Sequence, residues 1–233
     1  MWVAIIPRSK FLVEFAELGD MHFVVPDTPE LFDYYAQSDK FKMIDNGAYE
    51  LGKPISDEQL VRLAYQMDVD EVIAPDVLND AQQTLMRTRH FLETQTLRGL
   101  RVCVVPQGRT ISEWIECYKR MCRLPVQTIA IPIWIQKRFR ARPLVVKRLL
   151  KEGIFEKSLD HHLLGLDNIS ELYEYPKGVI RSVDTSLPLS LAYHRRVRAG
   201  KHTRLPTTAR FDEYQRQLAR MLIDKLKRIA ARR

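Results

Sequence analysis

Four polar side chains occupy similar places in the sequence, each directly after a short apolar run. They lie in the stretches "IDNGAYELG" (Asp45), "APDVLND" (Asp76), "VVPQGRT" (Gln107) and "SVDTSLP" (Asp184). Each stretch has a simple structural explanation on its own, because aspartate, asparagine, glycine and proline favour turns and helix caps. Together, three carboxylates and an amide at equivalent points of successive units are better explained by one shared site.

The chemistry open to this set is limited by what it contains. Two carboxylates can divide the roles of nucleophile and acid/base in the cleavage of a glycosidic bond. A third carboxylate and an amide are then available to bind the leaving group or an incoming base. Acyl transfer is poorly supported, because no serine lies in a nucleophile elbow and the nearest histidines, His161 and His162, stand at the start of a predicted strand.

Eight β-rich runs alternate with helical patterns along the chain. We predict strands at residues 2–6, 22–25, 41–44, 71–74, 102–105, 128–131, 162–165 and 179–183. Amphipathic patterns predict helices that start near Ser56, Asn79 and Ser112, and a last helix within residues 211–233. At the first of these helices, Ser56 and Gln59 form a capping-box pattern.

The alternation of strands and helices predicts a parallel α/β sheet. Eight such units predict a TIM-like (β/α)8 barrel, a single domain that spans residues 1–233. A doubly wound open sheet is the alternative, and the weak strands at 22–25 and 162–165 are where the count of eight is most easily wrong. Because the carboxyl ends of barrel strands meet at one mouth, the barrel brings the four polar side chains together.

The composition limits the class of protein. The 233 residues are 45% hydrophobic, and the apolar run that opens the chain is too short for a signal peptide or a membrane span. We therefore expect a cytoplasmic protein, in the host cytoplasm if it is viral, with no membrane partner. Cys103, Cys117 and Cys122 are too few and too irregularly spaced for a disulfide framework, so we interpret them as reduced core thiols. The formal net charge of +8 favours a polyanionic partner, although basic surfaces also aid solubility.

The order of the motifs resembles that of a known family, the queuine/archaeosine tRNA-guanine transglycosylases, and more closely their small phage relatives that place 7-deazaguanine bases in DNA. "DNGAYE" resembles the family's Asp-Ser-Gly-Gly-aromatic-Gln, and "VVPQG" resembles its Val-Gln-Gly. "HLLGLDNISEL" is similar to its Tyr-Leu-Met-Gly-Val-Gly strand with the helix that follows, and "VDTSLP" to its Phe-Asp-Cys-Val-x-Pro. The matches run in family order from about residue 43 to residue 188.

The resemblance implies a pentosyltransferase, an enzyme that exchanges guanine in DNA for a free 7-deazaguanine base such as 7-cyano-7-deazaguanine, with no cofactor. Asp184 would be the nucleophile that forms a covalent glycosyl-aspartate. Asp45 would be the general acid/base for the departing and arriving purine.

The resemblance also assigns residues that bind the base. Asp76 would accept hydrogen bonds from the ring N–H and the exocyclic amine of a guanine-like base, a donor pair that suits a carboxylate. Gln107 and the backbone N–H of Gly108 would face its carbonyl oxygen, and Tyr49 would stack on it. Asn46 replaces a serine of the family, which predicts different recognition of the substituent at position seven.

Two further departures from the family bear on metal and substrate. Pro132, in "AIPIW", stands where the family has Gly-Gly-Leu and cannot donate a backbone N–H. No cysteine follows Cys122, so the cysteine-rich zinc segment of the tRNA enzymes is absent from this sequence and we predict no structural metal. That segment belongs to an insertion that helps to engage tRNA, so its loss favours DNA, with RNA as the alternative.

Basic residues after the proposed nucleophile suggest where a phosphate backbone binds. The stretch "AYHRRVRAGKHTR" carries Arg195, Arg196, Arg198, Lys201 and Arg204, although a solvated basic loop has the same composition. "QKRFRARPLVVKR" is a second basic stretch, for which a charged helix face is an equal explanation.

Two other functions compete with base exchange. A small barrel glycoside hydrolase would use Asp45 and Asp184, but its sugar-binding aromatic residues are missing, because Trp114 and Trp134 are poorly placed in the sequence for that role. A non-catalytic nucleic-acid-binding barrel would leave the three carboxylates unexplained, since negative charge in the mouth repels phosphate.

Overall fold

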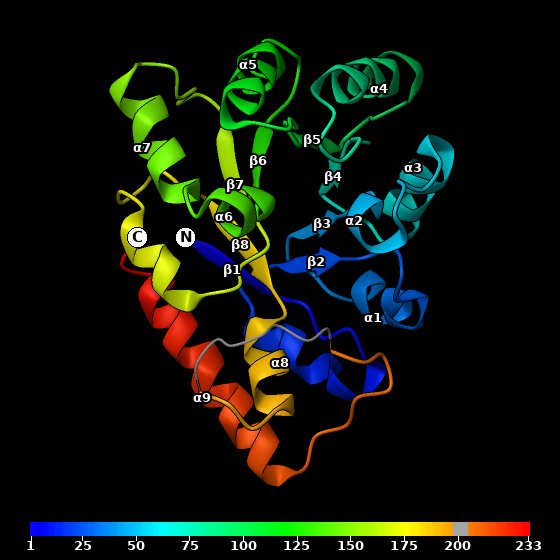
Figure 1. Ribbon diagram of the computed structural model, residues 1–233. Helices are drawn as coiled ribbons and strands as arrows, with labels where there is room; N and C mark the ends of the chain where they lie inside the picture. Colours follow the sequence, from blue (N-terminus) through cyan, green and yellow to red (C-terminus); the bar gives the residue numbers. More distant parts are fainter. Residues whose placement is uncertain (198–204) are drawn as a thin grey trace.

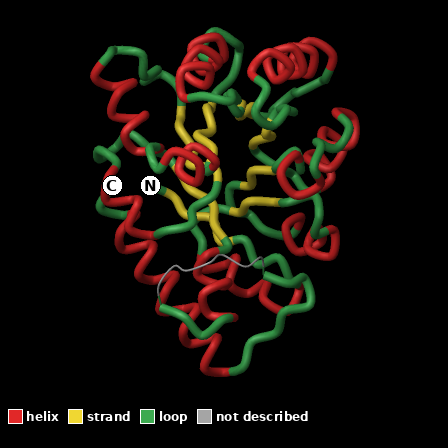
Figure 2. Tube along the Cα trace, in the orientation of Figure 1, coloured by secondary structure: helices red, strands yellow, loops and turns green. Residues whose placement is uncertain are grey.

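The computed structural model describes residues 1–197 and 205–233, in which eight parallel strands form a nearly closed barrel (Figures 1 and 2). Each strand from β2 to β7 pairs with the next, β8 pairs with β1, and an isolated bridge between Ala4 and Met21 links β1 to the start of β2. The predicted α/β barrel is therefore confirmed, and the doubly wound open sheet is excluded. The strands are β1 (Trp2–Ile5), β2 (His22–Val24), β3 (Lys42–Ile44), β4 (Glu71–Ile73), β5 (Arg101–Val104), β6 (Thr128–Pro132), β7 (Asp160–Leu164) and β8 (Ser182–Thr185).

Helices follow the strands and form an outer layer around them (Figure 1). The four predicted helices are confirmed within two residues at their starts, because each begins at a polar cap, as where Ser56 Oγ accepts from Gln59 N at 3.1 Å. The helices are α1 (Phe32–Ala36), α2 (Ala48–Leu51), α3 (Asp57–Gln66), α4 (Ala81–Thr94), α5 (Ile111–Met121), α6 (Trp134–Phe139), α7 (Arg142–Lys151), α8 (Leu187–Tyr193) and α9 (Glu213–Ala230). The 3-10 segments are η1 (Lys10–Leu18), η2 (Pro29–Leu31) and η3 (Ile169–Glu174).

Alternate residues of the strands face two different apolar cores. Side chains such as Phe23 and Met43 belong to a core that also holds Cys103, whereas Val24 and Ile44 pack into the core shared with the helices. This alternation follows from the two-residue period of a strand. The cysteines are free thiols, as interpreted from the sequence: Cys103 and Cys117 are buried and Cys122 is half-buried.

The last strand differs from its prediction. Residues 179–183 were predicted as the strand and Asp184 as the residue after it, but β8 is Ser182–Thr185 and Asp184 lies inside it, opposite Ala4 of β1. The apolar pair Val179 and Ile180 instead packs into the core between barrel and helices, before the strand begins. In the described part of the chain, no helix is both long enough and apolar enough to cross a membrane.

A buried ion pair ties the ends of two strands beside the mouth. Arg142, in the first turn of α7, is fully buried, and its Nε lies 2.8 Å from Glu171 Oε1. Its Nη1 donates to the carbonyl of Ile131 at 3.1 Å and to that of Leu164 at 3.3 Å, and its Nη2 donates to the carbonyl of Gly165 at 2.8 Å. One guanidinium therefore holds β6 and the loop after β7 together.

We expect Arg142→Leu to lower the free energy of unfolding by roughly 3–5 kcal/mol, because it leaves the buried Glu171 carboxylate without its cation. Urea denaturation measures this loss. The double variant Arg142→Leu/Glu171→Leu, which removes both charges, should lose less. Equal losses in the single and double variants would show that the unpaired carboxylate is not the cause.

Candidate active site

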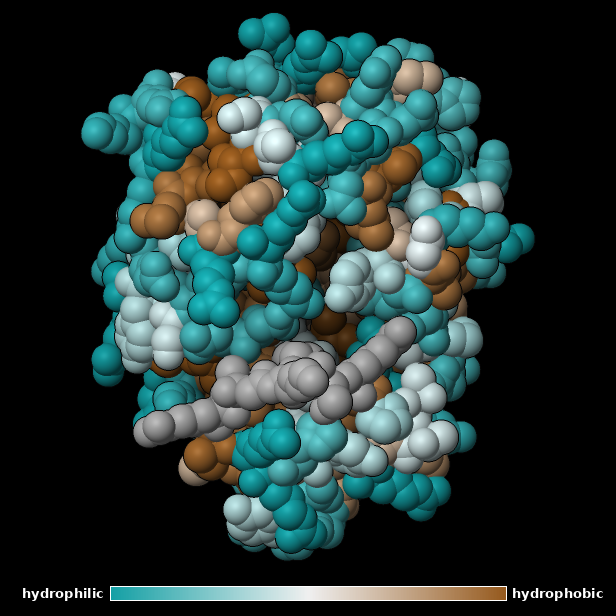
Figure 3. Space-filling view, viewed as in Figure 1, coloured by the Kyte–Doolittle hydropathy of each residue, from teal (hydrophilic) through white to brown (hydrophobic). Residues whose placement is uncertain are grey.

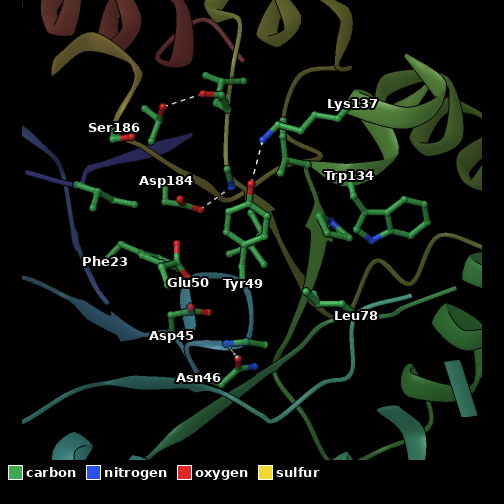
Figure 4. Close-up of a pocket in the computed structure, with 18 of the residues that line it drawn as sticks. Phe23, Asp45, Asn46, Tyr49, Glu50, Leu78, Trp134, Lys137, Asp184 and Ser186 are labelled. Carbon is green, nitrogen blue, oxygen red and sulfur yellow. Dashed lines mark hydrogen bonds between the residues drawn. The ribbon is translucent and has the colours of Figure 1, made fainter. Parts of the chain in front are cut away.

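A pocket of about 560 Å³ opens at the carboxyl ends of the strands, a size typical of small-molecule sites. Figure 3 shows the hollow in the middle of this face, with apolar side chains deep inside and hydrophilic ones around it. The structure brings six of the predicted residues to its wall: Asp45, Asn46, Tyr49, Asp76, Gln107 and Asp184. The wall also holds residues that the sequence reasoning did not assign, among them Arg8, Phe23, Glu50, Leu78, Trp134 and Lys137 (Figure 4).

Asp184 is held by two donors that reach the same carboxylate oxygen. His162 Nε2 lies 3.0 Å from Oδ1, and the backbone N of Gly165 lies 2.8 Å from it. The carboxylate is buried against the wall of the pocket. Within the described chain, Oδ2 is therefore the oxygen left for a substrate.

Gly165 must be glycine for this arrangement. Its φ of +78° is in the left-handed region, and a Cβ at this position would lie 3.2 Å from Cβ of Ile133. The loop after β7 can thus turn back and aim a backbone N–H at Asp184.

His162 corrects an expectation from the sequence. It was placed at the start of a strand and away from the site, but it lies in the middle of β7 and is fully buried beside Asp184. The Asp184 carboxylate can only accept a hydrogen bond, so Nε2 of His162 carries the proton that it donates. When the ring is neutral, Nδ1 has no proton and accepts a hydrogen bond from the Ser182 hydroxyl, 2.8 Å away. The ring also stacks on Phe23 at 5.7 Å. The alternation of side chains along β7 could have predicted this position. His162 lies on the same strand face as Leu164, which lines the pocket.

Asp76 is a buried carboxylate held by two amides. Asn46 Nδ2 lies 2.7 Å from one of its oxygens, and Gln107 Nε2 lies 2.6 Å from the other. The amides are themselves oriented, because Asn46 Oδ1 accepts from Ala48 N at 2.8 Å and Gln107 Oε1 accepts from Asn79 N at 3.2 Å. Burial nevertheless raises the pKa of Asp76. Asn46 and Gln107 therefore fix a carboxylate that faces the pocket.

Asp45 is a buried carboxyl group surrounded by other acids. Burial raises its pKa well above the ordinary value, and the negative charges of Glu50, Asp76 and Asp184 raise it further, against one hydrogen bond from Gly47 N at 3.1 Å. A protonated carboxyl beside a carboxylate can serve as a proton donor. This state suits the acid/base role that the resemblance implies for Asp45.

Arg8 and Glu50 complete this acidic wall and were missed from the sequence. Arg8 Nη1 lies 3.5 Å from Glu50 Oε1, and Nη2 pairs with Asp27. Burial raises the pKa of Glu50, and the charge of Arg8 opposes that rise. Arg8 comes soon after the end of β1, and Asp45 comes directly after the end of β3. Residues after the carboxyl ends of barrel strands lie at the mouth, so the reasoning that found Asp45 also predicts a place at the mouth for Arg8. The position of Glu50 does not follow from this reasoning, because Glu50 lies within the short helix α2 and not directly after a strand.

The rim of the pocket carries aromatic residues and a cation. Tyr49 is 67% exposed, and Lys137 Nζ lies 3.4 Å from its hydroxyl and 3.3 Å from Asp167 Oδ2 (Figure 4). Trp134, expected to be poorly placed for a site, lines the pocket as the first residue of α6. Trp114, by contrast, is fully buried in the core.

Gly108 follows Gln107 in sequence but is not among the described residues that line the pocket. It packs on the start of α5, where an added Cβ would lie 2.6 Å from the backbone N of Trp114. Its glycine identity is explained by this contact with the helix.

The predicted phosphate-binding stretch is described only at its start. Arg195 pairs with Asp212 and lies 5.5 Å from the ring centre of Tyr214, and Arg196 is exposed. The remaining predicted residues, Arg198, Lys201 and Arg204, lie outside the described residues. Neither Arg195 nor Arg196 lines the pocket.

The site can be compared with known proteins only through its fold and chemistry. No protein-family model matches the chain, and no curated protein matches it. The described residues contain no group of three or more His, Cys, Asp or Glu side chains placed to hold a metal ion. What the pocket offers is a carboxyl group held by His162 and Gly165, a carboxyl group whose pKa is raised by burial, and a second buried carboxyl group oriented by amides.

Proposed function

We propose that this protein is a pentosyltransferase that exchanges guanine in a DNA strand for a free 7-deazaguanine base through a glycosyl-aspartate. The observation that carries the proposal is the meeting of three differently held carboxyl groups, Asp184, Asp45 and Asp76, in one pocket of suitable size. It agrees with the roles that the resemblance to the transglycosylase family implies for these positions.

In the first half-reaction, Asp184 Oδ2 attacks the anomeric carbon of the sugar from the face opposite guanine. A C–O bond forms as the bond to the purine nitrogen breaks, and the electron pair leaves with the base. Asp45 gives its proton to the departing purine and becomes a carboxylate. His162 and the N–H of Gly165 keep the attacking carboxylate in place.

The second half-reaction reverses these steps with the new base. The ring N–H of the 7-deazaguanine loses its proton to Asp45, and the freed electron pair attacks the anomeric carbon and displaces Asp184. Two inversions retain the β-configuration, and Asp45 regains its proton. No net redox change occurs, so no oxidant or reductant enters the reaction.

Base recognition centres on Asp76. Each of its oxygens accepts one amide hydrogen bond and keeps a further acceptor position for the ring N–H and the exocyclic amine of a guanine-like base. Tyr49, exposed at the rim, is the ring that stacks on the base.

A glycoside hydrolase is the second candidate, and the position of Trp134 favours it more than the sequence did. Trp134 and Tyr49 both line the mouth, where sugar sites carry aromatic residues. The oriented cluster around Asp76 favours base exchange, because a sugar-cleaving site has no need of a buried acceptor pair for a purine edge. The nucleic acid can also be RNA rather than DNA.

One experiment tests the proposed base exchange: incubation with guanine-containing DNA or RNA and 7-cyano-7-deazaguanine, followed by nucleoside mass spectrometry. Base exchange yields the modified nucleoside and free guanine in equal amounts. Hydrolysis of the N-glycosidic bond, with water in place of the incoming base, yields free guanine alone. Absence of both products with either polymer would contradict the proposed transferase and leave the glycoside hydrolase and the non-catalytic barrel, which activity on oligosaccharides then separates.

We expect Asp76→Asn to reduce the rate of base exchange by about tenfold to a hundredfold. An amide N–H would then face the N–H groups of the base, and leaving these buried donors without an acceptor costs roughly 1–3 kcal/mol. Steady-state exchange measures the loss, and binding of the DNA strand should persist. As a control, Asp167→Asn changes a different acid of the pocket wall and should retain exchange. Unchanged exchange in Asp76→Asn would remove Asp76 from base recognition.

A further inference from the structure

The helix beside the pocket carries cations that the described chain does not neutralise. α6 begins at Trp134 on the pocket wall, and Lys137, one turn later, is also on that wall. Arg138 and Arg140 follow as exposed residues. Lys137 is paired with Asp167, whereas no ion pair within the described residues involves the other two.

Some surface cations of the protein are paired close by. Arg148 lies 2.8 Å from Glu152, Lys119 lies 2.7 Å from Glu116, and Arg195 pairs with Asp212. Among the described residues, the guanidinium of Arg138 lies over the ring of Phe139, 5.2 Å from its centre. Arg138 and Arg140 are therefore exposed cations, without an ion pair among the described residues, at the end of a helix that begins on the pocket wall.

The pocket itself excludes phosphate. Asp45, Glu50, Asp76 and Asp184 place carboxyl groups along its wall, and Arg8 inside it is already shared by two acids. A strand that delivers a base to this pocket must keep its phosphates outside, since like charges repel. The rim is where compensating cations are needed.

We propose that α6 binds the phosphate backbone of a single nucleic acid strand, with Lys137, Arg138 and Arg140 as the phosphate contacts. The inference rests on the proposed function and states where on the protein the nucleic acid substrate binds. It adds a second contact surface to the predicted stretch after the nucleophile, of which the structure describes Arg195, paired with Asp212, and the exposed Arg196. A target base in a duplex is stacked, so the strand must be single or the nucleotide flipped out.

Arg140 offers a variant that removes a charge without removing stability. It ends α6 with a φ of +50° in the left-handed region, where glycine is favoured. Arg140→Gly should therefore unfold at the same or a higher temperature and still bind the strand more weakly. Loss of binding in this variant cannot be assigned to misfolding.

The full test compares two triple variants that remove the same charge. In the first, Lys137, Arg138 and Arg140 become glutamine. In the second, the control, glutamine replaces Arg98, Lys157 and Lys177, exposed residues in the loops that enter strands at the opposite end of the barrel. Affinity for a short fluorescent guanine-containing strand, as DNA and as RNA, is measured across a salt titration, and the melting temperature is recorded for each protein.

We expect the α6 variant to bind roughly tenfold or more weakly at low salt and the slope of log affinity against log salt to flatten by about 2, because each lost contact to a single strand removes about 0.7 from the slope. The control should keep the wild-type slope. Equal slopes in the two variants, or a wild-type slope in the α6 variant and Arg140→Gly, would overturn the α6 surface while leaving base exchange intact. A wild-type protein that binds neither polymer would overturn the proposed function and this surface together.

Discussion

Replacing Asp184 by asparagine is expected to reduce base exchange by roughly 10⁴-fold or more and to leave binding of the DNA strand intact. Asparagine keeps an oxygen that can accept from His162 and from Gly165 N, so the side chain stays in position. It lacks the negative charge that attacks the anomeric carbon. No covalent complex can then form.

The measurement is a denaturing gel of enzyme mixed with guanine-containing DNA, in which the glycosyl-aspartate appears as a shifted band. Asp167→Asn, at another acid of the pocket wall, should retain the band. A band that survives in Asp184→Asn and disappears in Asp45→Asn would mean that the two roles are exchanged. Full turnover in both of these variants would contradict the transglycosylase proposal.

The part of this site that the sequence predicts is the part that follows from strand order. Asp45, Asp76 and Gln107 each come just after an apolar run, and parallel strands in a barrel end at one mouth, so their meeting needs no knowledge of side-chain contacts. Asp184 was found by the same rule, although it lies within β8 rather than after it. A short shift of a strand boundary leaves the carboxyl end of the strand, and hence the residue, at the same mouth.

The rest of the site depends on contacts that local sequence does not encode. His162 reaches Asp184 from the neighbouring strand, and Glu50 meets Arg8 across 42 residues of chain. A histidine inside a strand pattern is most simply explained as part of the core. Only the pairing of β7 with β8 shows that its ring supports a carboxylate.

The two basic stretches, residues 192–204 and 136–148, show again that local sequence does not encode contacts between distant residues. Both contain several arginines, and composition does not separate a neutralised cation from an available one. Arg195 has Asp212 beside it in space but 17 residues away in sequence, whereas Arg138 lies over the ring of Phe139. The structure therefore distinguishes a paired arginine from an unpaired one among the described residues, a difference that the two sequences do not carry.

Replacing Asp45 by asparagine is expected to reduce exchange by about 10²–10⁴-fold, the usual effect of losing a general acid, and at the same time to stabilise the fold. The carboxyl group is buried among Glu50, Asp76 and Asp184, so its ionisation is costly in the folded state. Asparagine can keep the hydrogen bond from Gly47 N without carrying a charge. The variant should be less active and melt at a higher temperature.

The pH dependence of this gain has a definite sign. The folded pKa of Asp45 is raised above its ordinary value of 3.8, so as pH rises from that value the unfolded chain releases the proton before the folded protein does. The stability of the wild type therefore falls through the window between the two pKa values and stays lower above it. The advantage of Asp45→Asn should be absent below pH 3.8 and grow as the pH rises through that window, as melting curves at several pH values can measure.

Glu50→Gln is the matched control, because it removes the charge that acts most strongly on Asp45 and leaves the acid itself in place. It should lower the pKa of Asp45, so formation of the covalent complex should begin to fall at a lower pH than in the wild type. In Asp45→Asn the complex should be weak at every pH. A Glu50→Gln profile identical to that of the wild type would show that Glu50 does not set the protonation of the acid. An Asp45→Asn protein with wild-type exchange would show that the proton comes from another group.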